Sequence, residues 1–222
     1  MIKKILLFCI FIIFLLPIKA QKFEDIFRSL SVKDRIWVAR NYSSVIEAKR
    51  ISLEVIATMD SLNIKNFLGG NSEGGLFDAF RHIYWMYCLA NELGSSRAER
   101  LGEIYENYDK WLFDVKKQKD YDQAGMDMDL FNNHLGILLS DSLIADSLVF
   151  NEIQNILNSG KAKVIKKNQN AESLDINGYI IPDSLWKNQW YNDRVLINSD
   201  ELDFYKSYPI SNMNTLQENY KK

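Results

Sequence analysis

The sequence predicts a mainly α-helical protein, a compact multi-helix domain with a small β-structured extension near its C-terminus. Apolar residues recur at helical spacing through most of residues 21–160, whereas short apolar runs between Asn, Asp and Gly follow residue 160. The composition, 47% hydrophobic and 25% charged, is that of an ordinary globular protein. We therefore expect a helical domain over 21–160, a β-hairpin-like extension over 161–198 and a polar tail over 199–222.

Residues 1–20 have the layout of a secretory signal peptide. Lys3 and Lys4 precede an apolar run of about 14 residues, and Ala20 provides the small residue expected before a cleavage site. A transmembrane helix needs about 20 apolar residues, so this run is short for an anchor. We expect cleavage after Ala20 and export to the periplasm or the medium, with no membrane span left in the mature chain. An uncleaved N-terminal anchor is the alternative.

Charge and cysteine content exclude two classes of protein. The 27 basic and 29 acidic side chains give a formal charge of −2, which becomes −5 when cleavage removes three lysines. No basic surplus points to nucleic acid, so we expect no nucleic-acid partner. Cys88 is then the only cysteine, so no intramolecular disulfide is possible, and its apolar neighbours favour a buried, unreactive thiol.

The first half of the mature chain predicts two helical segments separated by a loop. Residues 23–63 have helical periodicity, and Ser31 with Asp34 resembles a capping box. Four glycines within residues 68–75 indicate a loop. The helix expected over 76–93 is apolar around most of its circumference and ends at Gly94, so it should lie at the centre of the domain.

The second half predicts shorter elements. A helix should begin near Ser96, where Glu99 completes a capping-box pattern, and run to Lys116. Further helices are expected after Gly125 or Asp127 and over about 147–157. Two short strands are expected, at residues 162–166 and 178–181. A third segment, residues 195–197, would extend that sheet or cover the helical core.

Polar residues interrupt the apolar pattern at helical spacing in three of these helices. The helix over 76–93 and the helix after residue 125 each carry four such positions at i, i+3, i+4 and i+7, which share one helix face. The helix between them carries two acids three residues apart. The residues concerned are Asp78, Arg81, His82 and Trp85, then Glu103 and Glu106, then Asp129, Asn132, Asn133 and Gly136.

Two segments carry a family resemblance. Gly75-Leu-Phe-Asp-Ala-Phe-Arg-His-Ile-Tyr-Trp85 and Met128-Asp-Leu-Phe-Asn-Asn-His-Leu-Gly136 resemble a bacterial domain family of unknown function, found in exported proteins and at the C-termini of large polymorphic-toxin-like proteins. That family's pattern is Asp-Ala-Phe-Arg-His with a nearby Trp, a His-Glu pair, and Met-Asp-Leu-x-Asn-Asn-x-x-Gly. The resemblance covers about residues 45–140.

The resemblance transfers a candidate site and no reaction, because no activity is established for the family. The matching positions in this chain are Asp78, Arg81, His82, Trp85, Asp129, Asn132, Asn133 and Gly136. The His-Glu pair appears here as Tyr105-Glu106, so the glutamate is present without the histidine. If that histidine is a ligand or a base in relatives, this chain is a weakened or inactive version.

One hypothesis for the candidate residues is metal-assisted or general acid–base hydrolysis. His82 would bind a divalent metal or act as the base, with Asp78 or Glu106 orienting its other ring nitrogen. Arg81 would hold an anionic group such as phosphate. The remaining candidates, an acid and two amides that would complete an oxygen-rich set of ligands, are Asp129, Asn132 and Asn133.

The alternative is a non-catalytic exported domain. In that case the same residues form a structural hydrogen-bond network between helices, since buried polar groups need partners whether or not they catalyse anything. Such a domain would act as a binding or interaction module. Its contacts with a sugar or a partner protein would come from the aromatic residues Tyr179, Trp186, Trp190 and Tyr191.

Overall fold

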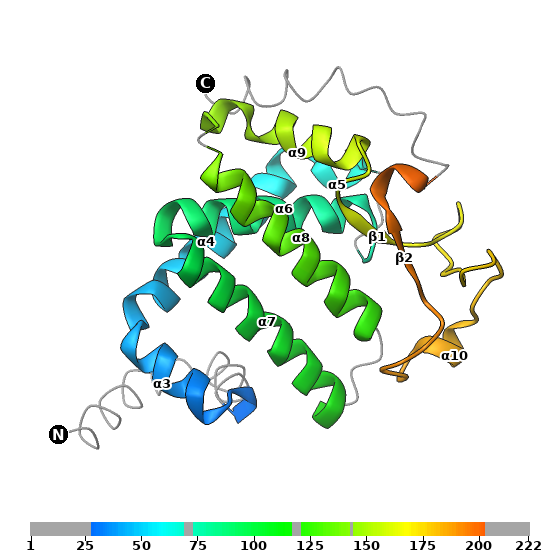
Figure 1. Ribbon diagram of the computed structural model, residues 1–222, viewed down its shortest axis with the longest axis horizontal. Helices are drawn as coiled ribbons and strands as arrows, with labels where there is room; N and C mark the ends of the chain where they lie inside the picture. Colours follow the sequence, from blue (N-terminus) through cyan, green and yellow to red (C-terminus); the bar gives the residue numbers. More distant parts are fainter. Residues whose placement is uncertain (1–27, 69–72, 117–120, 143, 203–222) are drawn as a thin grey trace. The chain divides into compact units, whose positions relative to one another are not determined.

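The computed structural model describes residues 28–68, 73–116, 121–142 and 144–202. These residues are mostly helical, with a small two-stranded antiparallel sheet near the C-terminus, which confirms the predicted fold class (Figure 1). The expected signal peptide and most of the expected polar tail lie outside the described residues. The chain divides into two compact units, the first ending at Asn41 and the second beginning at Tyr42. The predicted single helical domain over 21–160 did not include this division.

The first unit contains helix α3, Val32–Arg40. The hydroxyl of Ser31 accepts a hydrogen bond from the backbone N–H of Asp34, which confirms Ser31 as the N-cap. The helix expected over 23–63 is interrupted at Asn41, whose backbone leaves the helical conformation (φ −115°, ψ 32°). A second helix begins at the next residue.

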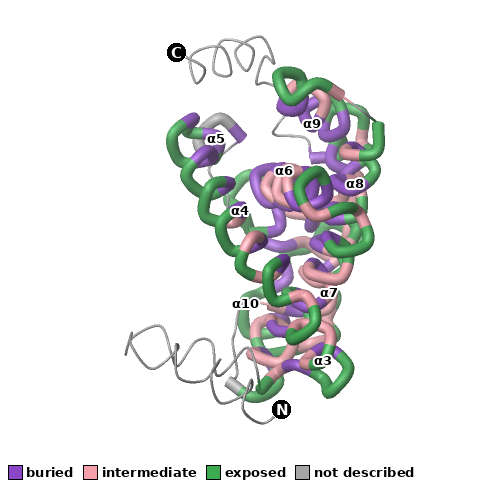
Figure 2. The backbone as a smooth tube through the Cα atoms, turned by 90° about the vertical axis from the view of Figure 1, so that its left-hand side faces the viewer, coloured by how far each residue is buried: buried purple, intermediate pink, exposed green. Residues whose placement is uncertain are grey.

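The second unit is built around α6, which is drawn mainly as buried in Figure 2. Its bounds, Leu76–Leu93 with Gly94 at φ 85°, agree with the prediction. The helices of this unit are α4 (Tyr42–Ser61), α5 (Ile64–Phe67), α6, α7 (Ser95–Lys116), α8 (Gln123–Asp141), α9 (Val149–Asn158) and α10 (Asp183–Trp186). Helices α4, α7, α8 and α9 pack directly on α6. Two polar residues of α6, Asp78 and His82, are buried in this interior.

Helix α8 begins earlier than the sequence suggested. Its N-cap is Asp122, whose carboxylate accepts the backbone N–H of Gly125, so that Gly125 and Asp127 lie inside the helix. Gly136 lies where α8 crosses α6 most closely. A Cβ at this glycine would stand 2.3 Å from the carbonyl oxygen of Ile83 and 2.8 Å from the Cβ of Met86. The absence of a side chain lets the two helices touch.

The sheet differs from the predicted hairpin. Strand β1 (Lys163–Ile165) pairs antiparallel with β2 (Leu196–Asn198), about thirty residues later in the chain. The segment 178–181 forms only an isolated bridge between Leu174 and Ile180. Two short 3-10 turns complete the elements, η1 (Asp146–Leu148) and η2 (Ser199–Glu201).

Strand β1 belongs to the helical core and not to a separate extension. Ala162 and Val164 are fully buried in the same apolar cluster as Phe80 and Ile83 of α6. The backbone N–H of Ile165 donates to the carbonyl of Gly74, just before α6. Gly74 has φ +64°, and a Cβ there would stand 2.8 Å from the Ile165 side chain. The strand thus packs tightly against the start of the central helix.

Candidate functional site

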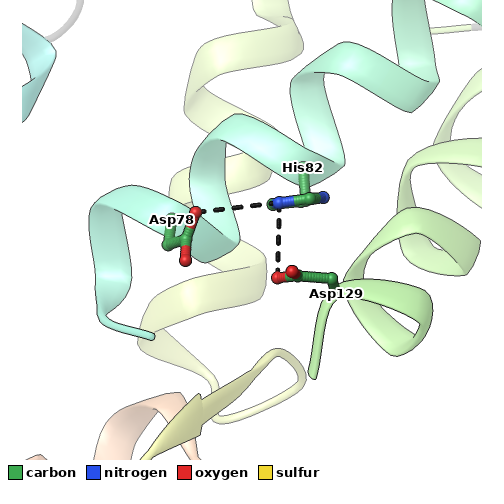
Figure 3. Close-up of side chains that lie close together, drawn as sticks. All are labelled: Asp78, His82 and Asp129. Carbon is green, nitrogen blue, oxygen red and sulfur yellow. Dashed lines mark ion pairs between the residues drawn. The ribbon is translucent and has the colours of Figure 1, made fainter. Parts of the chain in front are cut away.

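Three of the predicted residues come together between α6 and α8. Asp78 and His82 lie one turn apart on α6, and Asp129 faces them from α8 (Figure 3). Nε2 of His82 is 3.7 Å from Oδ1 of Asp78 and 3.3 Å from Oδ1 of Asp129. All three residues are buried, His82 with only 1% of its surface exposed. We call Asp78, His82 and Asp129 the triad.

Hydrogen bonds fix the proton of His82 on Nδ1. The guanidinium of Arg81 can only donate, and its Nη2 lies 2.9 Å from Nε2 of His82, so Nε2 accepts and carries no proton. Nδ1 therefore donates to Oδ1 of Asn133, 2.9 Å away. Burial, with the Arg81 charge adding to it, lowers the pKa of His82 to about 4. The ring is neutral at pH 7 and points the lone pair of Nε2 into the triad.

Asp129 is left without a hydrogen bond at the centre of the triad. Its Oδ1 is buried and has no hydrogen-bond partner, although Nε2 of His82 is close. Both atoms are acceptors, so they repel each other unless a proton or a cation lies between them. Burial, and then the charges of Asp78 and Glu106, raise the pKa of Asp129 well above its usual value. Without a cation, this carboxyl keeps its proton.

Asp78 has the opposite environment. Burial alone would raise the pKa of Asp78, but the Arg81 guanidinium and the backbone N–H of Gly74 outweigh it and lower the pKa. Arg81 donates to Oδ1 of Asp78, and the Gly74 N–H donates to Oδ2 over 2.8 Å. The two carboxyl groups are equally buried, yet Asp78 is charged and Asp129 is neutral.

Behind His82, a second set of buried residues is fully hydrogen-bonded. The amide nitrogen of Asn133 donates to Oε1 of Glu106 over 3.4 Å, and the hydroxyl of Tyr121 donates to Oε2 of Glu106 over 2.5 Å. Burial raises the pKa of Glu106 to about 8. Glu106 is 4.0 Å from Nδ1 of His82, on the side away from the triad. Glu106 and Asn133 are thus positioning residues that orient the ring.

Asn132 does not join this cluster. Its amide nitrogen donates to the carbonyl of Lys163 over 2.9 Å, and its amide oxygen accepts the backbone N–H of Lys163 over 3.1 Å. The side chain therefore extends the hydrogen bonding of β1. The predicted role of Asn132 as a ligand or catalytic group does not fit these contacts, because both polar atoms of the amide are used by the strand.

Trp85 and Tyr105 cover one side of the cluster. The Trp85 ring packs edge-on against His82, with ring centroids 6.2 Å apart, and its Nε1 donates to the hydroxyl of Ser52 in α4. Tyr105, which precedes Glu106 on α7, packs against Trp85 with ring centroids 5.4 Å apart.

Two contributors were not recognised in the sequence. Tyr121 donates to Glu106, but nothing in the local pattern around residue 121 marks it as a partner. The ammonium of Lys167 donates to the carbonyl of Glu73, and this carbonyl shares a peptide bond with the Gly74 N–H that binds Asp78. Burial, and then the nearby Arg194 charge, lower the pKa of Lys167 to about 8. The sequence around Lys167 gives no indication that its side chain contacts the loop before α6.

The other predictions divide between surface and core. His134 is exposed, as is nearly half of the Glu103 side chain, which pairs with Arg100. Burial raises the pKa of Cys88 to about 12, which agrees with an unreactive thiol. Of the four aromatic residues suggested for a binding surface, Tyr179 and Tyr191 are more than 70% exposed and Trp186 is buried.

The triad has the donor set and spacing of a metal centre. The three side chains offer one nitrogen and two oxygen ligand atoms, all within 4.8 Å of one another. Two ligands about 2.1 Å from a shared ion at the tetrahedral angle are about 3.4 Å apart, close to the two distances from Nε2.

A shallow pocket of about 180 Å³ lies away from the triad, against Gln123, Tyr191 and Arg194. No helix among the described residues is long and apolar enough to span a membrane.

A family model described as "Domain of unknown function (DUF6973)" matches residues 35–165, more than half of the chain. The matched region contains α6, α7, α8 and β1. It therefore includes the triad and the two residues that orient the His82 ring, Glu106 and Asn133. No curated protein and no solved structure matches the chain. The match shows that the chain belongs to this family, the domain of unknown function DUF6973.

Proposed function

We propose that this protein is an exported, metal-dependent hydrolase whose centre is the triad. The observation that carries the proposal is the pair of acceptors, Nε2 of His82 and Oδ1 of Asp129, which face each other at 3.3 Å with no hydrogen bond between them, Oδ1 having no hydrogen-bond partner at all. A divalent cation would satisfy both atoms and the Asp78 carboxylate at once. One imidazole and two carboxylates suit first-row divalent ions such as Zn²⁺ or Mn²⁺.

The number of ligands favours catalysis over a structural metal. Structural zinc sites have four protein ligands, whereas catalytic sites have three and keep a position for water. An ion held by three side chains would lower the pKa of such a water and so supply a nucleophile at neutral pH. The chain's own contribution is to orient His82 through Asn133 and Glu106, and to place Arg81 where it meets an anionic substrate.

The burial of the cluster favours the alternative, a non-catalytic exported domain. Glu106, Asn133 and Tyr121 are hydrogen-bonded to one another as a structural network would be. An ionised Asp129 does not fit such a network, because its inner oxygen then has no hydrogen bond, whereas a protonated Asp129 could donate from that oxygen to Nε2 of His82. The two functions therefore differ in what occupies the triad: a metal ion in the hydrolase, and a proton on Asp129 in the structural domain.

Metal analysis of the exported protein distinguishes the hydrolase from the non-catalytic domain. The protein is recovered from the periplasm or medium of a bacterial host, where mass spectrometry should show Gln21 as its first residue. We expect about one equivalent of a divalent metal, and a higher melting temperature when the stripped protein receives Zn²⁺ or Mn²⁺. Asp129→Asn should lose both effects. Asp127→Asn, an exposed position on the same helix, is the matched control and should keep them.

Hydrolysis is tested on the metal-loaded protein with chromogenic phosphate and carboxylate esters. Activity that a chelator removes, that returns with metal and that is absent in Asp129→Asn would support the hydrolase. A protein with no bound metal and no thermal response to any divalent ion would refute the metal centre. A protein that binds metal but cleaves none of these esters would refute hydrolysis of these substrate classes and leave a metal-binding module.

A further inference from the structure

Arg81 occupies the place where a cation would meet the triad. Its Nη2 donates both to Oδ1 of Asp78 and, over 2.9 Å, to Nε2 of His82. These are the atoms with which the two residues would bind an ion. One guanidinium nitrogen thus takes the contacts that a metal would make with two of the three ligands.

Arg81 also connects the buried triad with solvent. About 35% of its side chain is exposed, compared with 1% for His82 and about 10% for the two aspartates. The guanidinium end reaches the buried atoms while part of the side chain remains at the surface. Movement of this one side chain would therefore open the triad from outside without rearranging α6 or α8.

A guanidinium and a metal ion cannot share these contacts. Like charges repel strongly at this distance in a site with little water, and the single lone pair of Nε2 of His82 can bind only one of the two. Because about 35% of the Arg81 side chain is exposed, the guanidinium can move toward solvent, and the lower-energy arrangement with an ion bound is the one in which it has left. The released group would remain next to the ion, tethered by its own backbone.

We propose that Arg81 is an exchangeable occupant of the cation position: a divalent ion displaces its guanidinium, which then binds the anionic group of the substrate. This inference rests on the proposed function and adds the substrate class, an ester or amide with a phosphate or carboxylate next to the bond that is cleaved. Arginine suits this role because its planar donors bind such anions in bidentate geometry. Metal-free protein then lacks an anion site, and metal-loaded protein has one.

The exchange predicts that removing the guanidinium strengthens metal binding. The apparent affinity for an ion is reduced by the fraction of time that Arg81 occupies the position. Arg81→Ala should therefore bind Zn²⁺ or Mn²⁺ at least about tenfold more tightly than the wild type. Arg50→Ala is the matched control, since Arg50, like Arg81, pairs with an acid three residues before it but lies on the surface, and the metal affinity of this variant should equal that of the wild type.

The affinities are measured by isothermal titration of the chelator-stripped, exported protein. Wild type that binds metal and Arg81→Ala that binds more tightly support the exchange. Wild type that binds metal with Arg81→Ala equal or weaker overturns the exchange and leaves the proposed function intact. Absence of binding in both proteins overturns the proposed function itself. Binding only by Arg81→Ala shows a permanent occupant, which overturns both.

A second measurement uses the wild type and does not depend on whether Arg81→Ala folds. In ¹⁵N-arginine spectra, the Arg81 guanidinium of metal-free protein should exchange its protons slowly, because it is hydrogen-bonded to Asp78 and His82. Arg81→Lys assigns the signal. Addition of Zn²⁺ should make the exchange fast, and sulfate should then slow it again by binding the released group. A signal unchanged by bound metal would overturn the exchange.

Discussion

Asp122 and Asp129 are seven residues apart, at the N-cap and in the second turn of α8, and both are buried. Oδ1 of Asp122 accepts the Gly125 N–H, and Oδ2 accepts from Asn192 and Arg194, each over 2.8 Å. Oδ1 of Asp129 accepts nothing. The described residues supply hydrogen-bond partners for both oxygens of Asp122. They supply none for Oδ1 of Asp129.

The difference shows how a structural charge pair differs from a ligand site. Arg194 also has one unpaired buried nitrogen, Nε, but its guanidinium lies 3.9 Å from the centre of the Trp186 ring, which compensates the charge through a cation–π contact. Oδ1 of Asp129, in contrast, accepts no hydrogen bond from the described residues and depends on a proton or a cation for its partner. Depth of burial therefore does not separate the two roles, and completeness of the hydrogen bonding does.

The largest expected effect tests the structural member of the comparison. Asp122→Asn keeps a good N-cap but leaves the buried Arg194 charge without its counterion, so the free energy of unfolding should fall by about 3 to 5 kcal/mol. Urea unfolding followed by circular dichroism measures it. Metal affinity per folded molecule should not change. A loss below 1 kcal/mol, on the order of a surface substitution, would show that this pair is not structural.

Next in size is a substitution that separates the two helices of the triad. In Gly136→Ala the new methyl would collide with the Ile83 carbonyl, which costs about 2 to 3 kcal/mol and weakens metal binding by moving Asp129 away from His82. Urea unfolding and metal titration measure the two effects. The control is Gly102→Ala, where the nearest atom, at 3.2 Å, is the flexible end of Met86. That variant should keep both stability and affinity; equal losses in both variants would contradict the argument.

The pH dependence of stability sharpens the comparison further. Because the pKa of Glu106 is raised to about 8 in the folded state, the folded chain binds the extra proton, and stability should fall as pH rises from about 6.5 through 8. His82 adds nothing in this window, since its folded pKa is about 4 and its ordinary value 6.5. In metal-free protein, Glu106→Gln should make the decline shallower, while the exposed Glu103→Gln should not. Identical slopes for Glu106→Gln and wild type would contradict this assignment.

The smallest change in stability is expected for a substitution of Asp129. Asp129 keeps its proton in metal-free protein, so Asp129→Asn replaces a neutral group by one of nearly the same shape and should alter the free energy of unfolding by less than about 1 kcal/mol. Urea unfolding in the presence of a chelator tests this value. If Asp129→Asn were as costly as Asp122→Asn, the two carboxylates would have the same structural role.

Local sequence signals predicted the elements that carry the site. The helix over 76–93 and its end at Gly94 were confirmed, because apolar periodicity and a glycine at positive φ are properties of a single segment. The spacing of Asp78 and His82 placed them on one helix face, as observed. Export remains a prediction, since residues 1–20 lie outside the described part of the chain.

Asn132 and Asn133 show where such reasoning ends. Successive residues of a helix point about 100° apart, so one amide binds β1 and the next binds His82. The sequence marked both as candidates, but it could not tell which element faces each one. For the same reason, the sequence offered residues 195–197 as an extension of the sheet or a cover for the core, but could not tell that this segment pairs directly with β1.

The sequence by itself determined the helical elements, the shared face of Asp78 and His82, and the membership of Asp129 in a second polar face, because these depend on spacing along one helix. Only the tertiary structure decided that α8 brings Asp129 within 3.3 Å of Nε2, that Asn133 fixes the histidine proton, and that the Arg81 guanidinium donates to Nε2 of His82. These depend on how side chains from different helices share protons and contacts in a closely packed interior, which no local pattern encodes.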